Sequence, residues 1–214
     1  MSVAERQTRW LLYGIAALGP IILTVLLIVI FTRGTPTSRT GVSGPPPKIN
    51  YAALPGLQKG KAPWPPEYGS LPDRLKPLGL SALGGEAQVL HIHMHLDIFV
   101  NGKPVVVPKF IGIDDGAFLT ELHTHDSSGI MHVESPTKRV FALGQFFGVW
   151  GLRLSKRCLG GYCATRGKPL RVWVNGRRYR GDPNNLVLQA HQVIVIAYGK
   201  PPRPIPSTYD FRGL

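Results

Sequence analysis

Acidic side chains and cysteines are both scarce in this chain of 214 residues. Its 12 Asp and Glu stand against 25 Lys and Arg, so the formal net charge is +13. Such a basic surface suits an anionic neighbour, for example lipid headgroups, an anionic envelope polymer or an acidic partner protein, but it does not determine a fold. The sequence also lacks a Gly-rich phosphate loop, a dinucleotide fingerprint and a nucleophile elbow, so it offers no support for the activities that those motifs carry.

Charge is absent from one long run near the N-terminus, residues 11–32, which reads LLYGIAALGPIILTVLLIVIFT. A helix of about 22 residues spans roughly 33 Å, which matches the hydrocarbon core of a bilayer. Pro20 would break a soluble helix, but a membrane helix tolerates it as a kink. The run is longer than the apolar part of a signal peptide, and no small-x-small cleavage site follows it. We therefore predict an uncleaved transmembrane helix over 11–32 behind a cytoplasmic stub over 1–10.

Flanking charge does not fix the orientation of this helix. Arg6 and Arg9 precede it, while Arg33, Arg39 and Lys48 follow it, so the positive-inside rule favours neither side. A short stub followed by a single anchor is typical of a protein whose C-terminal part is exported. We therefore expect a single-pass protein of the cell membrane with an extracytoplasmic domain, and no nucleic acid among its partners.

The remaining chain divides by composition. Residues 33–85 are rich in Pro and Gly and predict an extended spacer, with one helical pattern over 71–78. Residues 86–199 predict the folded domain, and the Pro-rich residues 200–214 predict an extended tail.

Within 86–199 the patterns are mostly those of strands. Residues 89–100 alternate between apolar and polar and lead into Asn101-Gly102, a strong hairpin signal that recurs at Asn175-Gly176. Residues 192–198 are apolar on both faces, as in a central strand, and 143–150 carry aromatics at the spacing of a short amphipathic helix. We predict a mainly β fold, whether a small barrel, a sandwich or β-grasp-like hairpins, with that one helix.

Six of the seven histidines fall in two short motifs, HIHMH and LHTHDSSGIMH. Period-two alternation puts His91, His93 and His95 on the polar face of the first strand. The second motif predicts a hairpin closed by Asp126-Ser127-Ser128-Gly129, in which His123 faces His132. One face of that hairpin would then carry five side chains: Glu121, His123, His125, His132 and Glu134.

These two faces predict a transition-metal site if the motifs are neighbours in one sheet or face each other across a barrel. Neutral imidazole is the commonest side-chain ligand for metals, and copper and zinc suit it best here, with iron as a further candidate. The predicted ligands are His91, His93, His95, His123, His125 and His132. Glu121 and Glu134 could act as ligands, hold a histidine tautomer, or serve as a general base. His191 stands apart and is expected to be structural. The competing interpretation is a solvent-exposed strand face that is simply rich in histidine.

Cys158 and Cys163 enclose a loop of four residues. Outside the cytoplasm such a pair predicts a disulfide, which contributes about 2 kcal/mol for so short a loop. Thiolate ligation of a metal is the alternative. The spacing is not the CxxC of a redox motif.

Three blocks carry a resemblance: HIHMHLDIFVNGKPVVVP, LHTHDSSGIMHVESP and LRVWVNGRRYRGDPNNLVL. They resemble bacterial single-pass membrane proteins, of the kind found in actinobacteria, that have a His-rich extracytoplasmic β domain. The resemblance covers residues 64–199 and implies domain boundaries but no activity. The HTH hairpin is also similar to a cupin metal strand pair with a different carboxylate spacing. The last strands are similar to the end of a β-grasp domain without its diglycine terminus.

Together these patterns predict a membrane-anchored extracytoplasmic protein that binds a transition metal, for metal handling or in support of a membrane complex. One alternative is a metalloenzyme in which three histidines hold an ion that activates water. The other is a non-catalytic module that binds a partner protein through its basic surface.

Overall fold

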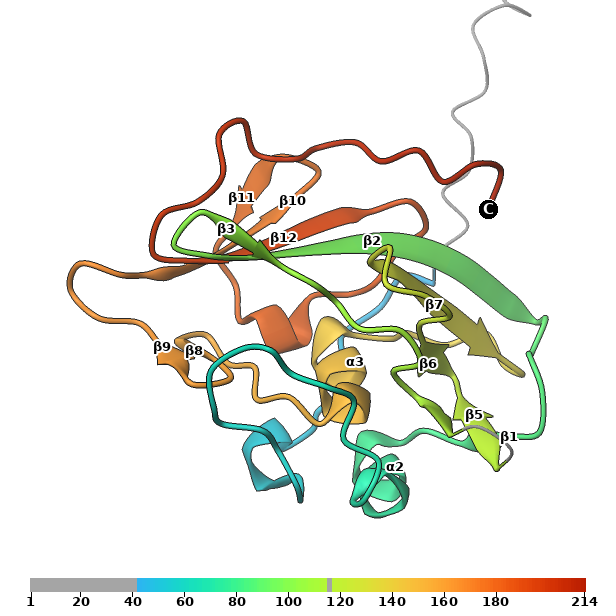
Figure 1. Ribbon diagram of the computed structural model, residues 1–214. Coiled ribbons are helices and arrows are strands. Elements are labelled where there is room, and N and C mark those ends of the chain that lie inside the picture. Colours follow the sequence, from blue (N-terminus) through green and yellow to red (C-terminus); the bar gives the residue numbers. More distant parts are fainter. Residues whose placement is uncertain (1–41, 115–116) are drawn as a thin grey trace, which may run out of the picture. The chain divides into compact units, whose positions relative to one another are not determined.

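The computed structural model describes residues 42–114 and 117–214 (Figure 1). The predicted stub over 1–10 and the predicted transmembrane helix over 11–32 lie outside these residues. Within the part of the chain that is described, no helix is both long enough and apolar enough to cross a bilayer.

A mixed sheet of seven strands forms the largest layer (Figure 1). Its path runs β11-β10-β12-β2-β7-β6, and β3 pairs with β2. The strands are β2 (Leu90–Val100), β3 (Lys103–Val105), β6 (Leu122–His123), β7 (Ile130–Ser135), β10 (Leu170–Val174), β11 (Arg177–Tyr179) and β12 (Val193–Tyr198). β12 and β2 run parallel, and the other paired strands of this sheet are antiparallel. The mainly β class is confirmed. Over the described residues the path ends at β11 and β6, so the sheet does not close into a barrel.

Both Asn-Gly turns form the predicted hairpins. Asn101 and Gly102 join β2 to β3 with φ angles of 51° and 83°, and Asn175 and Gly176 join β10 to β11 with 49° and 76°. A type I′ turn needs positive φ at both central residues, which Asn and Gly adopt at low cost. The predicted central strand is also confirmed, because all six residues of β12 are buried between β10 and β2.

Smaller elements surround the sheet. A three-stranded sheet contains β1 (Ala82–Leu83), β4 (Ile113–Asp114) and β5 (Phe118–Thr120), and a hairpin contains β8 (Cys158–Leu159) and β9 (Tyr162–Cys163). The helices are α2 (Leu71–Leu78) and α3 (Leu143–Trp150), with 3₁₀ turns η1 (Tyr51–Ala53) and η2 (Pro183–Asn185). Cys158 and Cys163 are joined by a disulfide, as predicted, so these thiols are not metal ligands.

The helix α3 is buried on all sides and not only on its aromatic face. It spans the predicted residues, but all eight of them are buried. Gly144 lets Tyr51 pack on the side of α3 that lacks aromatic residues. A Cβ at this position would lie 2.6 Å from the Tyr51 ring. Gln145 is satisfied by the carbonyl of Leu78, to which its amide donates at 2.9 Å. The predicted helix and the burial of its aromatics are confirmed. The side that carries Gly144, Gln145 and Gly148 is buried too, because glycines let neighbouring segments pack closely there.

The predicted spacer contributes to this core over the residues that are described. Trp64 packs edge-on against Trp150 and Tyr162, and the Trp150 indole N–H donates to the Trp64 carbonyl at 3.0 Å. Apolar residues of the same segment join the main cluster: Tyr51, Leu54, Leu71, Leu75, Leu78 and Leu80. Frequent Pro and Gly prevent long helices and strands, but they do not prevent apolar side chains from packing. Residues 42–85 are thus a layer of the domain and not an extended spacer.

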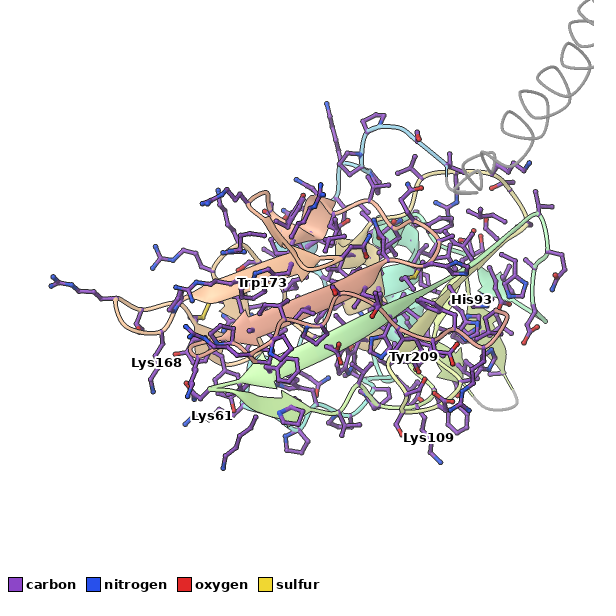
Figure 2. All side chains as sticks on the ribbon, turned by 90° about the horizontal axis from the view of Figure 1, so that it is seen from above. Lys61, His93, Lys109, Lys168, Trp173 and Tyr209 are labelled. Carbon is purple, nitrogen blue, oxygen red and sulfur yellow. A yellow bond between two sulfur atoms is a disulfide. The ribbon has the colours of Figure 1, made fainter. Side chains whose placement is uncertain are left out.

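The C-terminal tail has no regular element, as predicted, but it lies against the sheet (Figure 2). Ile205 and Tyr209 pack on a second apolar cluster, formed by Trp173, Val193, Val195 and Ala197. Phe211 stacks on His191, whose ring also bonds to the Leu214 carbonyl. His191 thus contacts the tail and belongs to neither of the ligand groups found among the described residues.

Candidate metal centre

Three adjacent strands place three imidazoles in one row. β7 lies between β2 and β6, and His132 of β7 is the direct partner of His93 on one side and of His123 on the other. His91 faces Glu134 in the next row of the β2–β7 pair. The predicted hairpin register of His123 and His132 is confirmed. The condition on which the predicted site depended is also met, because the two motifs are neighbours in one sheet. Side chains directly opposite one another share a face of the sheet, so these residues converge.

His132 lies at the middle of the cluster. Its ring centroid is 4.5 Å from that of His93, 5.2 Å from that of His123 and 4.5 Å from that of His125. Nitrogen atoms also meet in pairs on either side of it. His91 Nε2 lies 3.1 Å from His93 Nε2, and His123 Nε2 lies 3.3 Å from His125 Nε2. Two imidazoles bound to one tetrahedral zinc ion have their nitrogens roughly 3.3 Å apart, since each bond is about 2.0–2.1 Å long.

Two overlapping groups of four side chains have ligand atoms within 4.8 Å of one another. The first group is His91, His93, His132 and Glu134, and the second is His123, His125, His132 and Glu134. Each supplies three imidazole nitrogens and one carboxylate oxygen, a donor set that suits zinc, copper and iron. Either group could therefore hold a metal ion.

Glu134 is the shared carboxylate of the two groups and is only 1% exposed. Its Oε1 lies 3.2 Å from His91 Nε2, 3.2 Å from His132 Nδ1 and 3.5 Å from His123 Nε2. Burial alone would raise the pKa of Glu134, but hydrogen bonds from His123 and His132 outweigh it and hold the pKa well below its usual range. Among the described residues, its buried Oε2 has no hydrogen-bond partner. A buried, ionised carboxylate is thus held among imidazoles with one oxygen unused.

Backbone and amide acceptors fix the tautomers of two histidines. His123 Nδ1 lies 2.9 Å from the Thr120 carbonyl, and His91 Nδ1 lies 3.2 Å from the side-chain carbonyl of Gln88. Both partners are acceptors, so each Nδ1 carries a proton. Each Nε2 faces Glu134 Oε1 and is the nitrogen that a metal would take once any proton on it has left. Metal-bound histidines are commonly oriented in this way.

Two further histidines are held in the neutral form that binds metals. Burial, with smaller contributions from His132 and His91, lowers the pKa of His93 to about 4. Burial followed by the neighbouring His123 also lowers the pKa of His125. Neutral imidazoles are ready ligands at neutral pH, because no proton has to leave before a metal binds.

His95 and Glu121 do not belong to either group. His95 lies on the predicted face, but one row further along β2, where its Nε2–H donates to the Ser128 carbonyl at 2.9 Å and its ring stacks on Tyr209 with centroids 3.8 Å apart. The carboxylate of Glu121 is held elsewhere, by Ser135 Oγ, Arg139 and the Ser81 N–H. The expectation that these two join the site is therefore not met.

The structure also adds residues that sequence reasoning missed. Glu86 Oε1 lies 3.5 Å from His125 Nε2 at the exposed edge of the second group. An open cavity of about 360 Å³ adjoins His91, with Gln88, Leu90 and Lys138 among its lining residues. Glu86 lies shortly before the HIHMH motif, and this proximity in sequence was the signal that could have identified it.

Comparison of the chain with protein-family models, with curated proteins and with solved structures finds no match.

Proposed function

We propose that this chain is a membrane-anchored, extracytoplasmic protein whose β domain binds a transition-metal ion, with copper or zinc as the preferred ions and iron as a further candidate. The main support for this proposal is that three adjacent strands and a connecting loop bring six side chains together into groups of four ligand atoms. These side chains are His91, His93, His123, His125, His132 and Glu134. The proposed role of the protein is metal handling or support of a membrane complex.

Burial argues against a surface that is simply rich in histidine. His123 is 0% exposed, His93 is 8% exposed and Glu134 is 1% exposed. A buried carboxylate with an unpartnered oxygen costs free energy unless something satisfies it. A bound cation would satisfy the unpartnered Glu134 oxygen and take the surrounding imidazole nitrogens as ligands.

The proposed location rests on two supports. The apolar residues 11–32 have the length and composition of a bilayer anchor. The Cys158–Cys163 disulfide is typical of a protein exposed to an oxidising compartment. The partners that follow are the lipid bilayer through residues 11–32 and, for the basic surface, an acidic membrane-complex protein or an anionic envelope polymer.

A competition titration tests metal binding directly. The full chain in detergent is titrated with Zn²⁺ and, separately, with Cu²⁺ in the presence of a chromophoric chelator. We expect binding tight enough to compete with a micromolar chelator, and a loss of at least about 100-fold in the His132→Ala variant, since both groups use His132. His191→Ala serves as the control and should bind as the wild type does. A wild-type protein that binds neither ion would contradict the proposal. The non-catalytic module that binds a partner protein would then be the better explanation.

One observation favours a metalloenzyme as a second candidate. The open cavity beside His91 gives solvent and small molecules a path to the first group. An ion with an open coordination position could activate water there. Glu121 is held by Arg139 and Ser135 and cannot serve as the general base, whereas Glu134 lies in the cluster itself. The Co²⁺-loaded protein distinguishes the candidates: a visible spectrum that titrates near neutral pH indicates bound water, and an invariant spectrum indicates an all-protein site.

A further inference from the structure

We propose that the cluster holds two metal ions, one bound by His91 and His93 and the other by His123 and His125, with Glu134 and the imidazolate of His132 shared between them. Ligation through both ring nitrogens requires His132 to release its ring proton to solvent when the second ion binds. The inference rests on the proposed metal-binding function. It adds that the site is dinuclear.

The number of donors exceeds what one tetrahedral ion uses. Four ligands complete such an ion, whereas the cluster offers five imidazoles and one carboxylate. The donors are also divided in space. His91 and His93 form one close pair of nitrogens and His123 and His125 form another, and His132 lies between the pairs on the middle strand. Each pair completes a set of four only by including both shared residues.

Glu134 is placed to serve both sets. Its Oε1 lies 3.2 Å from His91 Nε2 of the first group and 3.5 Å from His123 Nε2 of the second group. Its Oε2 is buried and lacks a hydrogen-bond partner among the described residues. A carboxylate has two oxygens, so it can ligate one ion with each, as bridging carboxylates do in two-metal centres. In a two-ion centre Glu134 Oε2 would ligate the second ion. A single ion on Oε1 would leave Oε2 without a partner.

Charge predicts that the two ions bind in unequal steps. Two divalent ions bring four positive charges to a cluster whose buried carboxylate and bridging imidazolate supply two negative charges. Glu86 adds a second carboxylate beside His125, but it is nearly half exposed and its charge is partly screened by solvent. Repulsion between the ions should therefore make the second binding step weaker than the first.

Stoichiometry tests this inference on the full chain in detergent. Zn²⁺ is titrated calorimetrically, and the bound zinc is counted by elemental analysis after gel filtration in excess Zn²⁺. We expect two ions per wild-type chain. The His91→Ala and His125→Ala variants should each bind one ion under conditions that load two on the wild type. These residues are the more exposed members of their groups, so both variants should fold, which far-ultraviolet circular dichroism checks. His191→Ala is the control and should bind two.

Copper gives an independent readout. Two Cu²⁺ ions bridged by Glu134 couple magnetically, so the wild type should give a paramagnetic resonance signal well below its copper content. Each single-histidine variant, holding one ion, should give the full signal.

The outcomes separate the two proposals. One ion on the wild type, retained by both variants, would mean that a single ion uses either group, and it would overturn the dinuclear centre while leaving metal binding intact. One ion on the wild type that both variants lose would mean a single site built from both groups, with the same consequence. No ion on the wild type would overturn the proposed function as well.

Discussion

His93 on β2 and His132 on β7 face each other across an antiparallel pair, with their ring centroids 4.5 Å apart and their planes nearly perpendicular at 83°. His132 is also the direct cross-strand partner of His123 on β6. A single strand position therefore joins both histidine motifs, and the sheet itself, rather than a flexible loop, sets the spacing of three imidazoles. Loss of the His132 side chain should disturb both groups at once.

Trp64 tests whether the Pro- and Gly-rich segment is part of the domain. It is 3% exposed and packs on Trp150 and Tyr162. Trp64→Ala should lower the free energy of unfolding by about 3–5 kcal/mol, because it leaves a cavity in the core. Denaturant unfolding measures this, and Val106→Ala, at a residue that is 68% exposed, should change it by less than about 0.5 kcal/mol. Equal stability of the two variants would mean that the segment does not support the core.

Tyr51 predicts a loss of stability at high pH. Burial, with a smaller contribution from Asp182, raises the pKa of its hydroxyl from 10.0 to about 12. The folded state thus favours the neutral phenol. Stability should be intact below pH 10, where Tyr51 is neutral in both states, and should fall as the pH rises from 10 towards 12, where the unfolded chain ionises first.

Tyr51→Phe should remove this part of the pH dependence. The buried hydroxyl has no hydrogen-bond partner among the described residues, so its loss should not destabilise the protein at neutral pH. Thermal melts of both proteins at pH 7 and pH 11 provide the comparison. A marked drop in the melting temperature of Tyr51→Phe at pH 7 would show that the hydroxyl has a partner after all.

Tyr209 tests the role of the C-terminal tail. Its ring stacks on His95 and packs on the cluster around Trp173. Tyr209→Ala should lower stability by about 1–3 kcal/mol and shift Trp173 emission towards longer wavelength, because the sheet face becomes wetter. Tyr209→Phe keeps the ring and should resemble the wild type. Unchanged emission and stability in Tyr209→Ala would show that the tail does not cover this face in solution.

The disulfide should matter for stability but not for metal binding. Replacing both Cys158 and Cys163 with Ser should cost about 2 kcal/mol, since the closed loop is short. The two sulfurs bond to each other in the β8–β9 hairpin, which contributes no residue to either ligand group. Zinc binding by the double variant should therefore equal that of the wild type, and a reduced zinc content would contradict this separation.

Local sequence signals predicted much of the β architecture. Period-two alternation located β2, and Asn-Gly dipeptides located two hairpins, because type I′ turns have strict backbone requirements. The Asp126 turn fixed His123 opposite His132, because the register of a short hairpin follows from its turn. The convergence of five histidines and Glu134 followed once β2 and β7 proved to be neighbours.

These local patterns could not predict packing between residues that lie far apart in the sequence. The burial of Trp64 beside α3 depends on residues that lie 86 positions apart, and composition alone gave no sign of it. His95 shares the face of His93, but the partner opposite it is Ile130 and the tail covers it, so it meets Tyr209 instead of the cluster. The carboxylate of Glu121 forms an ion pair with Arg139, a residue outside both histidine motifs.

Elemental analysis of the full chain, purified in detergent without a chelator or a histidine tag, tests the central claim most directly. The wild type should carry copper, zinc or iron in a defined ratio to protein, His132→Ala should lose most of it, and His191→Ala should retain it. A wild type without metal, or equal metal content in the wild type and His132→Ala, would contradict the assignment of this cluster as a metal site.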